Sequence, residues 1–501
     1  MNSILEYLVS AAGRNPEQVA LADRERSLTY GELLRQSRAV GAYLKERVPA
    51  GSAVGVWAVR NVDTPVLFYG AVWAGCYYVP LDPGLRSGKL QKILDDCRPP
   101  VILTGDGAAP KLELSFSGAW VQLAHALACA AGQPDPVPGQ DPDAPLYMVY
   151  TSGSTGTPKG VLKSHGAMVS FIEAYTETFP FSTGEVLGNQ TPFCFDASAK
   201  DLYLALRLGA RIEILDTGLF SFPVKLIEYM NQRGVTFISW VPSALAIVTQ
   251  LNTFQEVKPT TLKWVLFVGE VFPMKQLNRW RAALPEVRFV NLYGSSELAG
   301  VCCYYEVRGE FADTDTLPIG GPLGNSRVYL VRDGQVVAAP REIGELYVAS
   351  PALALCYYRD EEKTAAAFRT VELRPGEPER VFCTGDLAQY TPDGLLVFAA
   401  RRDHQIKHMG HRIELGEIET AAGALDEVAR CCCVYDRERS RIVLFCQLTA
   451  GSGATGRDIL HALKEQLSDY MVPNRVRILP ELPLNPNGKI DRVALAQMLS
   501  K

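Results

Sequence analysis

The chain has 501 residues, more than a single hydrophobic core organises, so its length predicts two or more domains. Its hydrophobic content of 47% and charged content of 21% are ordinary for a soluble globular protein. A net charge of −5 gives no reason to expect a nucleic-acid partner, because such a partner needs a basic stripe.

Targeting and membrane signals are not apparent in the sequence. The longest apolar run, near Phe68 to Leu81, is too short to span a bilayer and is broken by Gly70 and Gly75. Residues 1–25 lack the cationic and then apolar pattern of a secretory signal. The 12 cysteines include no C-x-x-C pair, which favours free buried thiols. We therefore expect a cytoplasmic protein with no membrane partner.

Apolar runs typical of strands alternate with helix-like stretches through the first 400 residues. Strands are expected at Ala53–Trp57, Val101–Leu103, Ile212–Leu215, Thr236–Ser239 and Trp264–Val268, and helices at Ala39–Leu44 and Leu226–Met230. Such alternation predicts an α/β fold with largely parallel sheets. After Asp386 the sequence predicts a hairpin that turns at Pro392-Asp393-Gly394.

The segment Tyr150 to Gly160 reads YTSGSTGTPKG and follows the apolar run Leu146–Tyr150, which is typical of a buried strand. Its glycines let the backbone approach an anion closely, and its hydroxyl groups and Lys159 add donors to the same anion. It is not a Walker loop, since that motif has Gly-Lys-Ser/Thr in immediate succession. The segment therefore predicts a phosphate-binding loop at a strand end.

A charged patch near Arg401 to Asp403 interrupts the apolar pattern. Beyond it, the last hundred residues have the pattern of a small α+β unit. We therefore predict one domain of residues 1–402 and a second domain of residues 403–501.

Further motifs follow in a fixed order along the chain. They are LTYGEL (28–33), AGCYYVPLDP (74–83), FDAS (195–198), NLYGSSE (291–297), GEL (344–346), TGDL (384–387), GHRIELGEIE (410–419) and NGKIDR (487–492). With the phosphate loop they resemble the adenylate-forming enzymes, in particular the amino-acid adenylation domains of nonribosomal peptide synthetases and the freestanding D-alanine–carrier-protein ligases. This resemblance covers essentially the whole chain. It implies a large N-terminal adenylate-forming domain and a small, mobile α+β C-terminal domain.

The resemblance also implies an activity. A freestanding enzyme of this kind activates an amino acid with ATP, releases pyrophosphate, and transfers the aminoacyl group from aminoacyl-AMP to the phosphopantetheine thiol of a separate carrier protein. The implied cofactors are ATP and Mg²⁺. An acyl-CoA synthetase of the same superfamily is an alternative, and a nucleotide-binding regulator without turnover is another. Glu297 and Lys489 argue against the regulator, because both belong to the catalytic machinery that the resemblance implies.

The resemblance assigns roles at the nucleotide. Glu297 would hold Mg²⁺, Ser296 would contact the α-phosphate and Tyr293 would stack on adenine. Asp386 would accept hydrogen bonds from the ribose hydroxyls, and Arg401 would reach the ribose or a phosphate. The full set implied for ATP binding is Thr151, Ser152, Gly153, Ser154, Thr155, Gly156, Lys159, Asn291, Leu292, Tyr293, Gly294, Ser295, Ser296, Asp386, Arg401 and Lys489.

Two residues of the C-terminal domain complete the implied mechanism. Lys489 would bridge the substrate carboxylate and the nucleotide while the adenylate forms, so the implied catalytic set is Lys489, Glu297 and Ser296. Asp403 would be the hinge about which the small domain rotates afterwards, which opens a path for the carrier's thiol.

Asp196 indicates the substrate class, because family members that act on α-amino acids pair this aspartate with the substrate ammonium. The alternative is that Asp196 caps the helix that starts near Ala197. The implied lining of the substrate site is Asp196, Ala197, Lys200, Ser239, Leu266, Val268, Leu292, Gly300 and Val301. Lys200 could meet a side-chain carboxylate, or it could point outward or pair with Asp201 or Glu173. The other lining positions are small and apolar, so acidic and small neutral amino acids are equally favoured.

Overall fold

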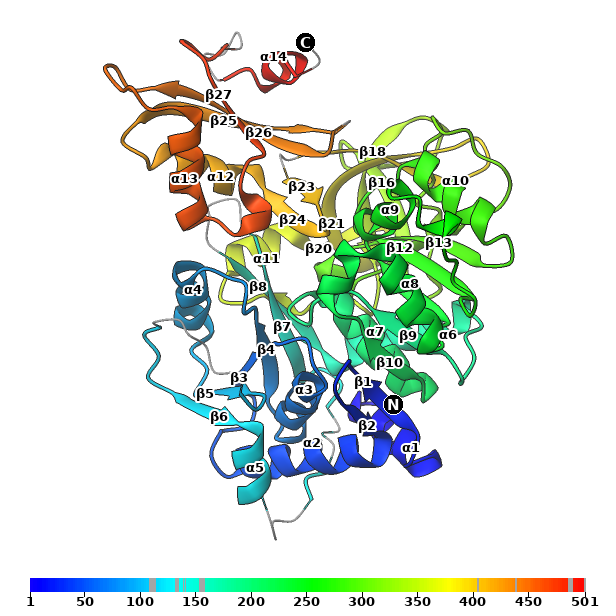
Figure 1. The fold of residues 1–501 in the computed structure, drawn as a ribbon. Coiled ribbons are helices and arrows are strands. Elements are labelled where there is room, and N and C mark those ends of the chain that lie inside the picture. The colour runs from blue at the N-terminus through cyan, green and yellow to red at the C-terminus, as the bar shows by residue number, and fades with distance from the viewer. Residues whose placement is uncertain are drawn as a thin grey trace.

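The structure, a computed structural model, describes residues 1–107, 114–130, 135–137, 139, 141–152, 158–402, 405–437, 439–484 and 490–499. Two large sheets and a third, antiparallel sheet form the body of the molecule (Figure 1). The C-terminal unit lies at one end of this body, and its hairpin of β23 (Gln405–His408) and β24 (His411–Glu414) lies on the side toward the body (Figure 1). The chain begins in the body and ends in the C-terminal unit.

The first large sheet has nine strands in the order β15-β14-β13-β12-β11-β9-β10-β1-β2. Their bounds are β1 (Val19–Ala22), β2 (Ser27–Thr29), β9 (Val186–Asn189), β10 (Arg211–Ile214), β11 (Phe237–Trp240), β12 (Trp264–Val268), β13 (Arg288–Tyr293), β14 (Cys303–Glu306) and β15 (Gly321–Pro322). The six strands from β13 to β1 are parallel, and the others are antiparallel edge strands. Alternate residues of β12 enter different cores, Leu266 one and Phe267 the other, so both faces of this sheet are buried.

The second large sheet has seven strands in the order β19-β8-β7-β4-β3-β5-β6. Their bounds are β3 (Ala53–Trp57), β4 (Tyr77–Leu81), β5 (Val101–Thr104), β6 (Ala119–Gln122), β7 (Pro145–Thr151), β8 (Lys159–Ser164) and β19 (Cys356–Tyr357). The strands β6, β5, β3, β4 and β7 are parallel, whereas β8 and β19 are antiparallel. The predicted phosphate loop therefore joins β7 to its antiparallel neighbour β8.

Helices connect and cover these strands, as the alternating pattern predicts. The α-helices are α1 (Leu5–Arg14), α2 (Tyr30–Lys45), α3 (Asp63–Trp73), α4 (Ser87–Cys97), α5 (Leu123–Cys129), α6 (His165–Thr178), α7 (Asp196–Leu208), α8 (Pro223–Gln232), α9 (Pro242–Gln250), α10 (Met274–Ala283) and α11 (Glu361–Ala367). The 3-10 helices are η1 (Thr217–Ser221), η2 (Thr253–Gln255) and η3 (Ser296–Leu298). Local sequence fixes some helix starts: Thr29 and Glu32 form a reciprocal capping box at the start of α2.

The third sheet is antiparallel throughout, with the order β17-β16-β18-β21-β20 and β22 paired to β21. Its strands are β16 (Arg327–Arg332), β17 (Gln335–Val337), β18 (Ile343–Ala349), β20 (Phe368–Arg374), β21 (Glu377–Tyr390) and β22 (Leu396–Arg401). The expectation of parallel sheets therefore holds for the first two sheets and not here. Short turns, two of which use Gly334 and Gly376 at positive φ, join most of these strands, whereas β19 and α11 lie between β18 and β20 along the chain. The predicted hairpin after Asp386 is confirmed as β21–β22.

The C-terminal unit contains a two-stranded and a three-stranded sheet. Its elements are β23 (Gln405–His408), β24 (His411–Glu414), α12 (Leu415–Gly423), β25 (Val428–Asp436), β26 (Arg441–Leu448), α13 (Gly456–Gln466), η4 (Asp469–Met471), β27 (Arg475–Ile478) and α14 (Arg492–Gln497). Residues such as Ile418 and Leu444 pack into a core of its own. The boundary at Asp403 stays a prediction, because Asp403 lies outside the described residues.

None of the helices in the described part of the chain combines the length and the apolar character that crossing a bilayer requires. The cytoplasmic location expected from the sequence stays a prediction.

Candidate active site

Glu297, the predicted metal ligand, lies in η3 directly after β13 and is fully buried. Its Oε1 accepts a hydrogen bond from the Tyr357 hydroxyl at 2.8 Å, and both of its oxygens accept from Arg412 Nη1 at 2.9 Å. The Lys159 ammonium lies 3.8 Å from Oε1. Burial alone would raise the pKa of Glu297, but Arg412 and Lys159 hold it well below its ordinary value. Glu297 is therefore an ionised carboxylate enclosed by protein groups.

The guanidinium of Arg412 reaches this position because the hairpin β23–β24 inserts into the site. The Ser152 hydroxyl, at the end of β7, donates to the Arg412 carbonyl at 2.6 Å. The Gly410 N–H donates to Glu270 Oε1 at 2.6 Å. Met409 and Gly410 form the tight turn, with φ of 52° and 80°. The C-terminal unit thus closes the site with its own backbone and one of its cations.

Asp386 and Arg401, both predicted at the nucleotide, are opposite each other in the ladder of β21 and β22. Arg401 Nη1 donates to Asp386 Oδ1 at 2.7 Å, and the Tyr293 hydroxyl donates to the other oxygen. The Lys407 ammonium of the hairpin lies 5.7 Å from the centroid of the Tyr293 ring. The residues predicted for ribose and adenine therefore lie together, beneath a second cation from the hairpin.

Two hydroxyl groups predicted at the nucleotide have no partner. The side-chain oxygens of Thr151 and Ser295 are buried and make no hydrogen bond to any residue that the structure describes. Burial, reinforced by the positive charge of Arg412, lowers the pKa of Lys159 to about 8. Asn291 differs from these residues, because its side-chain amide donates to the Pro318 carbonyl at 2.7 Å.

Some of the predicted residues cannot be placed. Gly153, Ser154, Thr155, Gly156, Asp403 and Lys489 lie outside the described residues. Their assigned roles stay predictions.

Asp196 is the first residue of α7 and is buried. The N-cap is Phe195, and no side chain caps this helix, so the capping alternative is not realised. The Tyr147 hydroxyl donates to Asp196 Oδ1 at 2.6 Å, whereas Oδ2 is buried without a hydrogen-bond partner among the described residues. Burial raises the pKa of Asp196, and the nearby charge of Lys163 opposes that rise.

Four predicted lining residues share one face of the nine-stranded sheet. Ser239 pairs with Leu266 across β11 and β12, and Val268 pairs with Leu292 across β12 and β13. Because Leu266 and Val268 are two residues apart in one strand, both pairs project from the same side. These side chains therefore form one surface.

Gly300 lies next to the open oxygen of Asp196. Its φ is 100°, and a Cβ atom there would be 3.7 Å from Asp196 Oδ2. A larger residue would therefore be strained and would fill the space beside that oxygen. Ala197 follows Asp196 in α7, and Val301 is buried next to Gly300.

Lys200 does not present a free charge to a substrate. Its ammonium is buried, forms an ion pair with Asp201 and donates to Ser239 Oγ at 2.9 Å. Glu173, the other partner considered from the sequence, pairs instead with Arg207 at 3.0 Å. The pairing of Lys200 with Asp201 is confirmed.

Four residues that the sequence interpretation did not single out contribute to this region: Tyr147, Lys163, Tyr357 and Arg412. Lys163 could have been noticed from the sequence, because it lies inside an apolar strand. A lysine there is either exposed or buried next to an opposite charge or another polar group. Arg412 lies inside a motif that was recognised, but its contact with Glu297 depends on how the hairpin docks.

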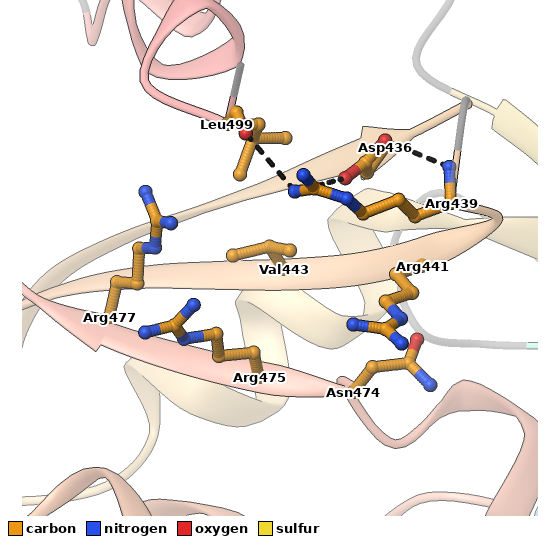
Figure 2. Close-up of a pocket in the computed structure, with 8 residues that line it drawn as sticks. All are labelled: Asp436, Arg439, Arg441, Val443, Asn474, Arg475, Arg477 and Leu499. Carbon is orange, nitrogen blue, oxygen red and sulfur yellow. Dashed lines mark hydrogen bonds and ion pairs between the residues drawn. The ribbon is translucent and has the colours of Figure 1, made fainter. Parts of the chain in front are cut away.

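A cavity of about 390 Å³ lies elsewhere, on the three-stranded sheet of the C-terminal unit. Figure 2 shows four arginine side chains around Val443. The eight lining residues are Asp436, Arg439, Arg441, Val443, Asn474, Arg475, Arg477 and Leu499. Arg439 pairs with Asp436 at 3.7 Å and donates to the Leu499 carbonyl at 3.4 Å. No predicted site residue lines this cavity, so it is separate from the region around Glu297 and Asp196.

Residues 8–358 match the family model of AMP-binding enzymes, and residues 417–489 match that of the AMP-binding enzyme C-terminal domain. The chain is 33% identical over 491 residues to an L-proline–L-prolyl-carrier protein ligase of Streptomyces coelicolor, covering 93% of this chain and 91% of the relative. It is 31% identical over 516 residues to the corresponding ligase of Pseudomonas fluorescens, covering 100% of both. The crystal structure of IdnL1 matches with a TM-score of 0.83 and 26% identity, over 96% of this chain and 99% of that chain. The chain therefore belongs to the family of AMP-binding enzymes.

Proposed function

We propose that this enzyme activates an amino acid with ATP to form aminoacyl-AMP and pyrophosphate, and then transfers the aminoacyl group to the phosphopantetheine thiol of a carrier protein. The observation that carries the proposal is Asp196, a buried carboxylate with one open oxygen. An unpaired buried carboxylate is costly, and a substrate ammonium removes that cost. Fatty and aryl acids bring no such group, so this feature disfavours the acyl-CoA synthetase alternative. The two proline ligases that resemble the chain support the carrier as acceptor.

The family implies ATP as the nucleotide, and the donors near the phosphate loop fit an anionic ligand. Thr151 and Ser295 offer buried hydroxyls without partners, and Lys159 offers a cation. We propose that these groups bind the phosphates, and that Asp386 and Arg401 bind the ribose. Each Asp386 oxygen already accepts a hydrogen bond from the protein, which orients this carboxylate.

The same region fits a magnesium ion under one condition. Mg²⁺ is commonly held by one or two carboxylates together with nucleotide phosphates and water. Glu297 is ionised, and the described residues contain no cluster of three or more His, Cys, Asp or Glu that would serve as a dedicated cage. Arg412 engages both oxygens of Glu297 in this arrangement. Mg²⁺, which would offset the charge of the leaving pyrophosphate, therefore requires the hairpin to move away.

This condition suggests how the two half-reactions alternate. We propose that the arrangement with Arg412 on Glu297 belongs to aminoacyl transfer, when pyrophosphate has left. During adenylate formation the C-terminal domain would turn about Asp403, withdraw Arg412 and bring Lys489 to the substrate carboxylate. Arg412 would thus contact the site only during aminoacyl transfer, and Lys489 only during adenylate formation.

The test is amino-acid-dependent exchange of labelled pyrophosphate into ATP. The screen includes L-proline, the other common amino acids, and D- and β-amino acids, with fatty and aryl acids as separate arms. Exchange with at least one amino acid is expected. Exchange with fatty or aryl acids alone would establish the acyl-CoA synthetase alternative, and no exchange with any acid would favour a regulator without turnover.

A further inference from the structure

A second buried charge near Asp196 has no role in the reaction as proposed so far. Lys163 lies in β8, and the solvent-exposed fraction of its side chain is 0%. Its ammonium makes no hydrogen bond to any residue that the structure describes. Burying an ammonium without an acceptor is costly, so this position lacks the acceptor that would stabilise it.

The register of the strands directs Lys163 toward Asp196. Lys163 is directly opposite Tyr147 in the antiparallel ladder of β7 and β8, so the two side chains project from the same face. The Tyr147 hydroxyl reaches Asp196 Oδ1. The positive charge of Lys163 lies close enough to Asp196 to oppose the rise of its pKa. Yet Lys163 Nζ and Asp196 Oδ2 both lack partners, so they do not bond to each other.

Two unpaired groups of opposite charge match a zwitterion. A substrate ammonium would donate a hydrogen bond to Asp196 Oδ2, and a substrate carboxylate would accept one from Lys163 Nζ. In an α-amino acid these two groups are separated by a single carbon, so one molecule carries both. A singly charged ligand would leave one of the two groups without a counter-charge, and a neutral ligand would leave both.

The surroundings of Lys163 indicate which carboxylate it meets. Its charge also interacts with Glu297, which lies on the nucleotide side of the site. The residues predicted to line the substrate side chain, such as Leu266 and Leu292, lie on the nine-stranded sheet, whereas Lys163 comes from the seven-stranded sheet. Lys163 therefore comes to Asp196 from a different sheet than the residues predicted to line the substrate side chain, which favours the α-carboxylate over a side-chain carboxylate as its ligand.

We propose that Lys163 binds the reacting carboxylate of the amino acid whose ammonium binds Asp196. The inference rests on the proposed function and deepens it, because the sequence suggested Lys489 for the reacting carboxylate and Lys200 only for a side-chain carboxylate. Burial lowers the pKa of Lys163 to about 8, and an arriving carboxylate would favour its charged form. Lys163 would hold the carboxylate in place for its reaction with ATP.

A merely structural role for Lys163 predicts a different pattern of binding. If Lys163 only keeps Asp196 ionised, its loss weakens every ligand that brings an ammonium, with or without a carboxylate. If it binds the carboxylate, its loss weakens the amino acid far more than the corresponding amino alcohol. The ratio of the two dissociation constants therefore separates the roles.

The experiment compares Lys163→Met with the unsubstituted full chain by calorimetry. The first probes are L-proline and L-prolinol, followed by the amino acid that gives most exchange and its amino alcohol. Methionine has nearly the length of lysine, and removing an unpaired buried charge favours folding. We expect the preference for the acid to fall by roughly ten- to a hundredfold, the range of a charge-assisted contact. Lys275→Met, at an exposed lysine of α10, should leave the preference unchanged.

Each other outcome overturns the inference. If Lys163→Met weakens the binding of the amino acid and of the amino alcohol equally, Lys163 only keeps Asp196 ionised. A change only in the preference for L-glutamate over L-glutamine would assign Lys163 to a substrate side chain. If Lys163→Met fails to fold, Lys163→Gln is measured in the same way. Pyrophosphate exchange separates the two levels: exchange with an amino acid but an unchanged preference rejects only the inference, whereas no exchange with any amino acid rejects the proposed function as well.

Discussion

Glu297 and Asp196 are both buried carboxylates, yet their surroundings are opposite. Glu297 accepts hydrogen bonds from Tyr357 and Arg412 and has a lowered pKa. Asp196 accepts one, from Tyr147, and has a raised pKa because burial outweighs a cation that does not touch it. One half of the site is saturated and the other is open.

The source of the partners explains this contrast. Arg412 comes from the C-terminal unit, so a movement of that unit can remove it from Glu297. Tyr147 and Lys163 come from the same ladder in the body of the molecule, next to α7. The contacts of Glu297 therefore depend on the position of the hairpin. The groups around Asp196 come from the body of the molecule and leave one carboxylate oxygen for a ligand.

Replacing the open carboxylate should have the largest effect. In Asp196→Asn a bound ammonium would be buried without a compensating charge, which costs roughly 3–5 kcal/mol, or about a thousandfold in the specificity constant for exchange. Steady-state exchange kinetics over amino-acid concentration measure it. A loss below tenfold would remove Asp196 from ammonium binding.

The two buried lysines should respond oppositely to the same substitution. Lys200→Met would leave the buried Asp201 without a counter-charge and with only the hydrogen bond from Asn189, which should lower the free energy of unfolding by about 3 kcal/mol. Lys163→Met removes a charge that has no hydrogen-bond partner. The free energy of unfolding should therefore stay within about 1 kcal/mol of that of the unsubstituted chain, or rise. Denaturant titration of both variants makes the comparison. Similar destabilisation would mean that Lys163 is held by an interaction equivalent to that of Lys200.

Removing the Arg412 guanidinium should leave the oxygens of Glu297 with fewer hydrogen bonds, as is the case for Asp196. In Arg412→Met we expect the Mg²⁺ concentration for half-maximal exchange to fall by roughly tenfold, because a competing charge-assisted contact is lost. Aminoacyl transfer to the carrier should slow. The matched control is Arg86→Met, which breaks an exposed ion pair of 3.0 Å between Arg86 and Asp469. An unchanged Mg²⁺ requirement in Arg412→Met would contradict competition at Glu297.

The smallest expected effect is at the tyrosine that orients Asp196. Tyr147→Phe removes one hydrogen bond worth about 1 kcal/mol, so KM for the amino acid should rise by roughly fivefold with little change in kcat. Tyr30→Phe removes another buried hydroxyl, which donates to the Ala210 carbonyl at 2.6 Å, and should leave KM unchanged. A fall in kcat at constant KM would show that Tyr147 acts in the chemical step.

Strands with strong apolar runs were predictable from the sequence. The expected strands Ala53–Trp57 and Trp264–Val268 match β3 and β12, and the other three are displaced by a single residue at one or both ends. Helices were recognised only in part, because a few buried positions mark a helix without marking its ends. Thus Ala39–Leu44 lies inside α2, which extends from Tyr30 to Lys45. Of the antiparallel third sheet only the hairpin β21–β22 was predicted, since strand patterns alone do not give the direction of pairing.

The site was predictable where function depends on residue type and not where it depends on pairing. Asp196 and Glu297 were identified from their motifs, and the structure places both in buried positions. The sequence offered Lys200 either as a ligand of a side-chain carboxylate or as a partner of Asp201, and it could not decide between them. Lys163 was missed because its proposed role depends on its cross-strand neighbour Tyr147 and on the lack of a hydrogen-bond acceptor for its ammonium among the described residues.

The single hydroxyl that Tyr147 gives to Asp196 limits what this carboxylate can discriminate. Oδ1 is engaged by Tyr147, and Oδ2 is the oxygen without a partner that an incoming amine would complete. One N–H is enough for one oxygen, and both a primary ammonium and the ring nitrogen of an imino acid have one to give. Selection between straight-chain and cyclic substrates must then be made by shape, against the apolar surface of β12 and β13.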